Sequence, residues 1–476
     1  MLLSLLLLVV AVGCLGLDLG EERYLTQPLN HNDKLNPRIL QQRYFWYKAP
    51  DPKASTLIFF YAGNEANVEN YVKTCGLMHE NALEFNAAMV FAEHRFWGKS
   101  QPRTTHQSLG FAGPDQAIQD YLALLRYIQR TEHGSFAFGK RVRVIAFGGS
   151  YGGMLAAWMR LKHPNVISAA VASSAPILAF PSDKAGFYHD GGAAYWNVVT
   201  KVFKPCANSV HSALLQLNRT RALQELGVCP NSKAQPTVQD LVMWVGYALE
   251  TLAMGDYHFA SDYITGSELP ARPAKLACDR LLQAQYRGAS PLEAVREAVG
   301  VFYNTSAHPQ TCYDIPNRYN ASFYDGLWDQ YWCRWLIPQE TYFAMRGPPN
   351  DMFLPLPLDW HEIARHCKLD TKVAAMDFTA VDRWFGATSE HEWETKASKI
   401  IFVNGGHDPW SAGGYYSDRN PTLPTIFIET GAHHVDLMFA KPNDPEDLVV
   451  ARKQILDILR RWFSVVDGGV EAASTF

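Results

Sequence analysis

The first chemical signal in the sequence is a serine flanked by glycines, Ser150, in the run Gly-Gly-Ser-Tyr-Gly-Gly at residues 148–153. It directly follows an apolar stretch and directly precedes a helical pattern that starts near Met154. A sharp strand-to-helix turn of this kind lifts a serine hydroxyl above a sheet, where it can attack a carbonyl carbon. The glycines are required because a Cβ atom there would collide with neighbouring backbone. The sequence therefore predicts that Ser150 is a nucleophile.

A serine nucleophile needs a general base, and the base needs a carboxylate that orients it. After such a turn the chain order is serine, then Asp or Glu, then His, each on a loop that follows a strand. Asp408 follows one apolar stretch, and His433 and His434 follow the next, so the order is met. The sequence does not separate His433 from His434 as the base, and His407 is a weaker third candidate.

Acyl transfer also needs hydrogen-bond donors for the oxyanion that forms on the attacked carbonyl. The backbone N–H of Tyr151, the residue after the nucleophile, is the expected first donor. The second should come from the loop after the apolar stretch 56–61, which holds Gly63 and Asn64. Of these two we favour Asn64.

The elements that must hold these residues are apolar stretches alternating with helical patterns. Strands are predicted at 56–61, 87–92, 141–147, 167–172, 399–403 and 425–428. Helices are predicted at 115–131, 153–163 and 445–463, the last one capped by Asp444. Strands that are apolar on both faces belong in a parallel sheet covered by helices.

The alternation stops near Pro176 and returns near residue 399, and the stretch between reads mostly helical. There Thr237 and Asp240 form an N-terminal capping signal before the apolar run 241–254. We expect an α/β-hydrolase fold with a large, mostly helical cap domain inserted between sheet strands. The expected division is a signal peptide at 1–17, the α/β-hydrolase domain at 18–177 and 396–476, and the cap domain at 178–395.

Several features predict export. The apolar run at residues 2–12 is too short to cross a bilayer and ends in small residues, as a secretory signal does. Six of the cysteines lie between residues 206 and 367, which indicates disulfides, whereas Cys75 is expected to be a buried free thiol. Three N-glycosylation sequons lie in the same region, at Asn218, Asn304 and Asn320. The cysteines lack the paired C-x-x-C spacing that is typical of a zinc site, so we expect no metal or other cofactor.

Composition excludes several other classes of protein. The chain has 476 residues, with 43 Lys and Arg against 47 Asp and Glu, so no basic field exists to bind nucleic acid. Its aromatic content of 13% is too high for a disordered chain. No later segment is long and apolar enough to span a membrane. The sequence leaves a homodimer open.

Three motifs resemble the lysosomal serine exopeptidases that cut after proline, the family of Pro-X carboxypeptidase and dipeptidyl peptidase II. They are GGSYGGM at 148–154, NGGHDPWSAGG at 404–414 and GAHHVDL at 431–437. Residues 61–65 and 90–95 resemble further stretches of that family. The similarity covers nearly the whole mature chain and is strongest at 56–177 and 399–437.

The resemblance implies that His433, the first of the pair, is the base. It also implies the disulfides Cys206–Cys278, Cys229–Cys312 and Cys333–Cys367, where the sequence alone leaves fifteen pairings. Proline specificity requires a flat apolar slot, and the family pattern supports Trp410 as its aromatic face and Met154 as its deformable wall. Peptides with proline next to the scissile bond are the expected substrates, and the secretory pathway, ending in the lysosome or outside the cell, is the expected location.

Which end of the peptide is held depends on the charge that meets it. A dipeptidyl peptidase must pair an α-ammonium group with a carboxylate, whereas a carboxypeptidase must meet an α-carboxylate with a cation or with donors. The stretch 328–333 resembles the dipeptidyl type, although Gln330 and Tyr331 are exchanged and Arg334 and Trp335 replace the usual pair after the cysteine. Asp329 and Glu65 are therefore candidate ammonium anchors.

We therefore predict a serine exopeptidase that releases N-terminal Xaa-Pro, or Xaa-Ala, dipeptides through an acyl-enzyme. The alternative is a Pro-X carboxypeptidase, which removes a C-terminal residue after proline. A more remote alternative is a catalytically inactive hydrolase fold that serves as a binding module.

Overall fold

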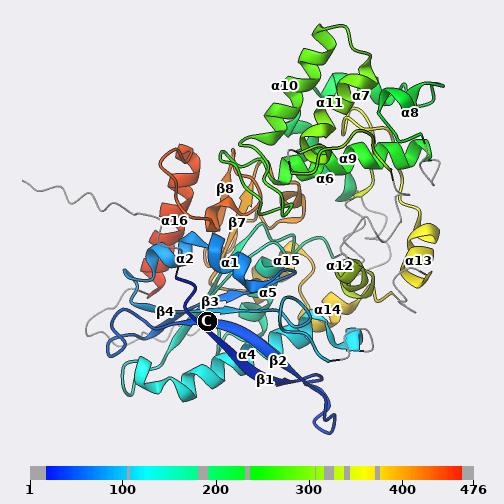
Figure 1. Cartoon of the computed structure of the whole chain (residues 1–476). Coiled ribbons are helices and arrows are strands. Elements are labelled where there is room, and N and C mark those ends of the chain that lie inside the picture. Colours follow the sequence, from blue (N-terminus) through cyan, green and yellow to red (C-terminus); the bar gives the residue numbers. More distant parts are fainter. Residues whose placement is uncertain are drawn as a thin grey trace, which may run out of the picture.

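A mixed eight-stranded sheet forms the centre of the molecule, which is a computed structural model (Figure 1). The structure describes residues 18–103, 108–180, 191–230, 236–305, 307–315, 326–336, 343–369 and 376–463. The signal peptide predicted at 1–17 and the sequon at Asn320 lie outside these residues. Asn218 and Asn304 are both exposed.

The strand order is β1-β2-β4-β3-β5-β6-β7-β8. The strands are β1 (Glu21–Pro28), β2 (Ile39–Tyr47), β3 (Leu57–Ala62), β4 (Ala87–Ala92), β5 (Arg143–Gly149), β6 (Ala169–Ser173), β7 (Ile400–Gly405) and β8 (Thr425–Ile428). β1 pairs with β2, and β2 with β4, in antiparallel fashion, and the remaining pairs are parallel. The chain has the α/β-hydrolase fold.

The six predicted strands correspond to β3–β8, but the sequence analysis missed β1 and β2. The reason lies in their burial, because most of β1 is exposed and carries charged residues, so it lacks a continuous apolar run. β2 alternates between exposed and buried residues only at its start. Both strands form the antiparallel edge of the sheet, where one face can meet water.

Each face of the sheet has its own hydrophobic core, because neighbouring strand residues point to opposite sides. Ile58 and Phe60 pack in one cluster with α4 (Pro114–Thr131) and α5 (Tyr151–Lys162). Phe59 and Tyr61 pack in the other cluster, which also takes residues of three further helices. These are α1 (Val68–Thr74), α2 (Gly76–Asn81) and α16 (Glu446–Phe463). Asp444, predicted to cap α16, instead accepts hydrogen bonds from His258, Arg452 and the N–H of Lys441.

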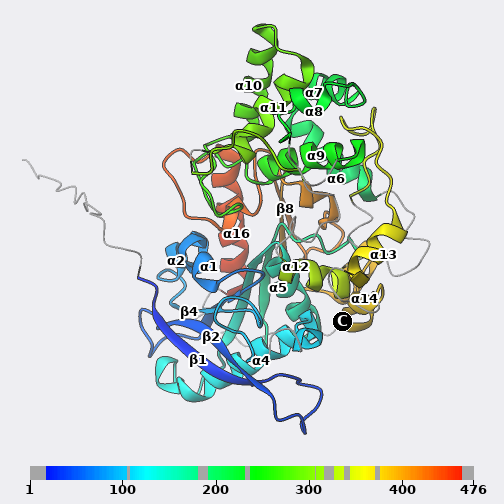
Figure 2. The same cartoon turned by 45° about the vertical axis from the view of Figure 1, so that its right-hand side comes forward.

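A third cluster belongs to helices that stand beyond one end of the sheet, above β7 and β8 in both views (Figures 1 and 2). They are α6 (Gly191–Val202), α7 (Ala207–Leu214), α8 (Ala222–Glu225), α9 (Val238–Met254), α10 (Pro273–Tyr286) and α11 (Pro291–Tyr303). We call these six helices the cap. The capping box predicted at Thr237 and Asp240 is present at the start of α9.

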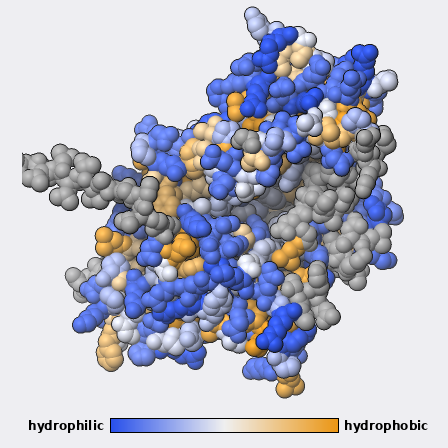
Figure 3. Space-filling model, viewed as in Figure 1, coloured by the Kyte–Doolittle hydropathy of each residue, from blue (hydrophilic) through white to orange (hydrophobic). Residues whose placement is uncertain are grey.

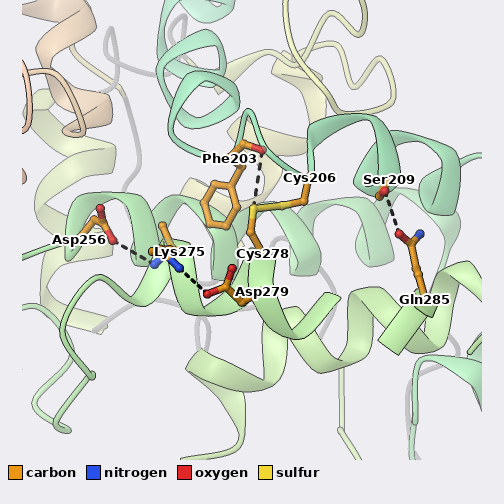
Figure 4. Close-up of a disulfide and its surroundings, with 9 residues drawn as sticks. Phe203, Cys206, Ser209, Asp256, Lys275, Cys278, Asp279 and Gln285 are labelled. Carbon is orange, nitrogen blue, oxygen red and sulfur yellow. Dashed lines mark hydrogen bonds and ion pairs between the residues drawn. A yellow bond between two sulfur atoms is a disulfide. The ribbon is translucent and has the colours of Figure 1, made fainter. Parts of the chain in front are cut away.

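Three disulfides join the cysteines in the pairs that the family resemblance implies. Cys206–Cys278 ties the start of α7 to α10 (Figure 4), and Cys229–Cys312 closes a second loop of the cap. Cys333–Cys367 joins the segment after α12 (Gly326–Tyr331) to α13 (Trp360–Leu369). Cys75 is free and buried.

Part of the segment predicted as cap packs onto the sheet domain instead. Tyr331 and residues of α14 (Ala380–Phe385) and α15 (Glu390–Lys396) belong to the cluster that holds α5. Phe385 stacks on Trp158 of α5 with ring centroids 4.3 Å apart. The end of α12 and the residues that follow it, Trp335 and Leu336, therefore pack against the sheet domain.

The surface seen in Figure 3 is largely hydrophilic, with apolar residues scattered over it in small groups. Within the described parts of the chain, no helix combines the length and the hydropathy that a membrane span requires.

Candidate active site

Ser150 lies at the turn between β5 and α5 with the unusual backbone angles φ 58° and ψ −129°. Its neighbours in the turn are buried, whereas Ser150 itself is partly exposed. A Cβ atom on Gly148 would lie 2.1 Å from the carbonyl oxygen of Gly152, and one on Gly152 would lie 2.7 Å from that of Ala62. The backbone is therefore packed so tightly that only glycine fits on either side of the serine.

Asp408 and His433 come together from the loops after β7 and β8. Nδ1 of His433 lies 2.9 Å from Oδ2 of Asp408, and the two residues are 4% and 0% exposed. The other oxygen of Asp408 accepts the N–H of Trp410 at 3.1 Å. The ring N–H is not well aligned on Oδ2, and neither atom has another hydrogen-bond partner among the described residues. Catalytic hydrogen bonds are often poorly aligned in a free enzyme and tighten when substrate binds.

The other two histidines have different partners. The ring of His434 packs against the backbone of Gly149. The backbone N–H of His434 donates to Ser174 Oγ at 2.8 Å, and its backbone φ is 36°. Burial, aided by the adjacent His433, holds the pKa of His434 well below its usual range. His407 pairs with Asp256 of the segment after α9 at 2.8 Å. His433 is thus the histidine that faces Asp408.

The donors expected for an oxyanion lie beside the serine. Tyr151 occupies the first position of α5, where helical bonding leaves N–H groups without a partner in the helix. Asn64 is buried and its side chain lies against Gly152, because a Cβ there would be 2.9 Å from Asn64 Oδ1. The N–H of Gly63 is already bonded to Ala92 O at 3.1 Å, which leaves Asn64 as the better candidate on that loop.

A cavity of about 520 Å³ has Ser150, Tyr151, Asn64, His433 and His434 among its lining residues. This volume is within the range of sites that hold small organic ligands. Met154 and Trp410, the predicted proline slot, also line it. Trp410 meets the rings of Tyr195 and Phe343 edge-on, with centroids 5.4 and 5.5 Å away. Trp328, which also lines the cavity, has a stacked contact instead: its ring lies parallel to that of Tyr331 and is tilted against that of Tyr151.

The sequence pattern of the family described as serine carboxypeptidase S28 matches residues 27–333 and 364–455. The chain belongs to this family. It is 30% identical over 457 residues to the lysosomal Pro-X carboxypeptidase of Homo sapiens, which covers 92% of this chain and 87% of that protein. The Bos taurus protein of the same name is 30% identical over 465 residues, covering 93% and 88%. The thymus-specific serine protease of Homo sapiens is 26% identical, covering 93% and 86%.

Among solved structures, the proline iminopeptidase of Mycobacterium smegmatis matches with a TM-score of 0.36 and 12% identity, covering 93% of this chain and 99% of that one. The family match and the relatives at 30% identity make the protein a serine-type exopeptidase of the S28 family, and the relatives named above include lysosomal proteins. The disulfides agree with passage through the secretory pathway.

The two acidic residues proposed as ammonium anchors both line the cavity of this S28 peptidase, but in different states. Asp329 is 2% exposed, and its carboxylate oxygens lie 2.8 and 3.0 Å from Nε2 of His366. The Asp329 carboxylate therefore already has His366 as its partner. Burial raises the pKa of Glu65, while a hydrogen bond from Asn64 opposes that rise. Glu65 Oε2 is buried without a hydrogen-bond partner among the described residues.

The sequence analysis missed the face of α9 that forms the roof of the cavity. Met243, Tyr247, Glu250, Thr251 and Met254 line the cavity at helical spacing. A signal was present in the sequence, because three of these residues are polar within an otherwise apolar helix. Periodicity alone could not show that this stripe faces a cavity rather than solvent. No Lys or Arg is among the described residues that line the cavity.

Proposed function

We propose that Ser150, His433 and Asp408 form the catalytic triad of this serine exopeptidase. Ser150 Oγ attacks the scissile carbonyl while Nε2 of His433 takes its proton, and Asp408 holds the imidazolium that results. The N–H of Tyr151 and Asn64 stabilise the oxyanion. The leaving amine then takes the proton from His433, and water resolves the acyl-enzyme by the same steps. The observation that carries the proposal is one cavity lined both by the serine of a strained turn and by His433, which is paired with the buried Asp408 behind it.

Proline is proposed to bind between Met154 and Trp410, before the scissile bond. The indole of Trp410 is fixed by edge-on contacts with Tyr195 and Phe343, so its face keeps a constant position in the cavity. Met154 is 2% exposed and adapts in shape more easily than a branched side chain. A pyrrolidine ring is flat and apolar, and a slot of this kind favours it over larger polar side chains.

We propose that the enzyme is a Pro-X carboxypeptidase, which removes the C-terminal residue that follows proline. Relatives at 30% identity that span most of the chain carry this name, which favours it over the dipeptidyl reading of the sequence. The state of Asp329 also supports it, because a carboxylate already paired with His366 is a weaker anchor for an ammonium group. A protonated Glu65, which its raised pKa favours in mild acid, could donate a hydrogen bond to the substrate carboxylate.

One observation favours a dipeptidyl peptidase as the second candidate. Three carboxylates, those of Glu65, Glu250 and Asp329, line the cavity, and no Lys or Arg does so among its described residues. Such a lining attracts an α-ammonium group more strongly than an α-carboxylate.

Two peptides blocked at opposite ends test these proposals. Acetyl-Ala-Pro-Phe with a free carboxylate should be cleaved to release Phe, whereas Ala-Pro-Phe-amide with a free amine should be resistant, in assays by mass spectrometry at pH 5. The reverse pattern would establish the dipeptidyl alternative. Failure of a fluorophosphonate probe to label Ser150 would overturn the proposed triad.

We also propose that the chain is exported and works in the lysosome or outside the cell. The three disulfides and the exposed sequons at Asn218 and Asn304 support this. Peptide-N-glycosidase treatment of the protein from a secreting cell should lower its apparent mass.

A further inference from the structure

The segment that joins α9 to α10 reaches from the cap to both loops that carry the proposed base and its carboxylate. It begins at Met254, the last residue of α9, passes through Asp256 and Tyr257, and ends at Arg272, directly before α10. We call Met254, Asp256, Tyr257 and Arg272 the cap clamp. Its polar contacts reach His433 itself and His407, the residue before Asp408.

The cap clamp binds both backbone groups of His433. The N–H of His433 donates to the carbonyl oxygen of Met254 at 3.0 Å. The hydroxyl of Tyr257 donates to the carbonyl oxygen of His433, also at 3.0 Å, and this tyrosine is 2% exposed. The backbone of the proposed base is therefore positioned by the cap.

The cap clamp also binds the residue before Asp408. Oδ2 of Asp256 lies 2.8 Å from Nδ1 of His407, and Asp256 is buried. The two loops are joined directly as well, because the N–H of His407 donates to Gly431 O at 2.8 Å. A shift of Asp256 would thus move the Asp408 loop relative to the His433 loop.

Arg272 and the start of α10 hold Asp256 and Tyr257 in place. The Arg272 guanidinium donates to Asp256 O at 3.1 Å and to Thr430 O at 3.3 Å, and its backbone N–H donates to Tyr257 O at 2.7 Å. The N–H of Ala274 donates to the second carboxylate oxygen of Asp256 at 3.1 Å. Figure 4 shows Asp256 beside this end of α10, near the Cys206–Cys278 disulfide.

We propose that Tyr257 and Asp256 are positioning residues for catalysis, which set the approach of His433 to Asp408 from the cap. The inference rests on the proposed triad. His433 Nδ1 and Asp408 Oδ2 are 2.9 Å apart but imperfectly aligned, so a small shift of either loop breaks or completes their hydrogen bond. A misplacement of about 1 Å can cost on the order of 100-fold in rate.

The first test removes one hydroxyl. Tyr257→Phe should lower kcat roughly 10- to 100-fold with KM changed less than about threefold, because Tyr257 is not among the residues that line the cavity. Labelling of Ser150 by a fluorophosphonate should slow by a similar factor, since it depends on the base and not on the proline slot. The matched control is Tyr303→Phe, which removes a hydroxyl bonded to Trp244 O at 2.8 Å inside the cap.

The control should keep the kcat and the labelling rate of the unmodified enzyme, although both variants lose one hydrogen bond of the same kind. A Tyr257→Phe enzyme with unchanged kcat and only a lower melting temperature would overturn the proposal. Equal losses of kcat in both tyrosine variants would also overturn it, because they would reflect general destabilisation.

A second, independent test uses the pair Asp256 and His407. Asp256→Asn and His407→Gln should each lower kcat roughly 3- to 10-fold, and the double variant should lose no more than the worse single one. Additive losses would show that the pair does not act as a unit and would contradict the role of Asp256.

The unmodified enzyme separates this inference from the proposed function. If it neither reacts with the probe at Ser150 nor cleaves either blocked peptide, the triad fails. If the unmodified enzyme reacts with the probe and cleaves a blocked peptide, while the Tyr257 and Asp256 variants keep full kcat, only the proposed role of the cap clamp is wrong.

Discussion

The wall of the cavity that carries Ser150 and the wall that faces it from the cap are held by different kinds of contact. Around Ser150 the contacts join backbone atoms of one short turn and the adjacent strand, such as Gly148 with Gly152 and Ser150 N–H with Ser173 O at 2.9 Å. On the cap side, aromatic rings of Tyr195, Phe343 and Trp410 meet from three distant segments. The first wall is thus determined locally, and the second depends on the assembly of the whole chain.

This difference suggests that one wall serves the chemical step and the other serves substrate selection. The proposed nucleophile and the proposed oxyanion donors need a fixed backbone, and a short glycine-flanked turn supplies it. Substrate selection needs side chains of particular shape, and these can change without disturbing the turn. The cap clamp connects the two, since it positions the proposed base from the cap.

The largest effect should come from a substitution in the wall that carries Ser150. Ser150→Ala should lower kcat on the order of 10⁴- to 10⁶-fold, because the nucleophile is lost while the remaining site still binds substrate. Circular dichroism and the melting temperature should match those of the unmodified protein. Turnover of a proline peptide within tenfold of the original rate would remove Ser150 from the mechanism.

A second prediction concerns the assembly of the cap. Replacing Cys206 and Cys278 together by Ala removes a cross-link between residues 72 apart in sequence. Loop-closure entropy predicts a loss of about 4 kcal/mol in the free energy of unfolding. Urea unfolding followed by tryptophan fluorescence would measure it. If the wall that carries Ser150 does not depend on the cap, the rate of fluorophosphonate labelling of the folded variant should stay within about threefold of that of the unmodified enzyme.

The same difference between the two walls explains which parts of the molecule the sequence predicted. Strands β3–β8, α4, α5 and the Ser150 turn follow from patterns within a few residues, and the structure shows all of them. β1 was missed because it is mostly exposed and carries charged residues, and β2 because Gln41, Gln42 and Arg43 interrupt its apolar residues. Contacts such as Tyr257 with His433 and Asp256 with His407 join residues 176 and 151 apart, and no local pattern reports them. The pairing of Asp329 with His366 was missed for the same reason.

A third prediction concerns pH and the loop that carries His433. Burial raises the pKa of Asp436 from 3.8 to about 6, against an opposing hydrogen bond from Ser173. The folded state therefore keeps a proton that the unfolded chain releases near pH 4. Stability from this group is complete below about pH 4 and is lost as the pH rises through 6, by up to about 3 kcal/mol.

Asp436→Asn replaces this carboxyl with a side chain that stays neutral. The free energy of unfolding of the variant, taken relative to that of the unmodified protein, should rise by about 2 to 3 kcal/mol from pH 4 to pH 7.5. Urea unfolding at both pH values would measure this change. A stability difference that does not change with pH would show that Asp436 titrates normally. The control Asp377→Asn alters a partly exposed ion pair with Arg383 and should give a shift below about 1 kcal/mol.

The smallest effect should appear where the two walls meet, at Trp410. This residue follows Asp408 in the sheet domain, but its ring contacts Tyr195 and Phe343 from the cap side. Trp410→Leu keeps an apolar surface and loses the flat face, so the preference for proline over alanine before the scissile bond should fall about tenfold, equivalent to about 1.4 kcal/mol. The ratio of kcat/KM for two peptides that differ only at that position measures it. Trp384→Leu, a partly buried tryptophan of α14 outside the described cavity lining, should leave the ratio unchanged. If Trp410→Leu lowered kcat for both peptides equally, Trp410 would act on the adjacent Asp408 instead of on the substrate, and the separation of chemistry from selection would fail at this residue.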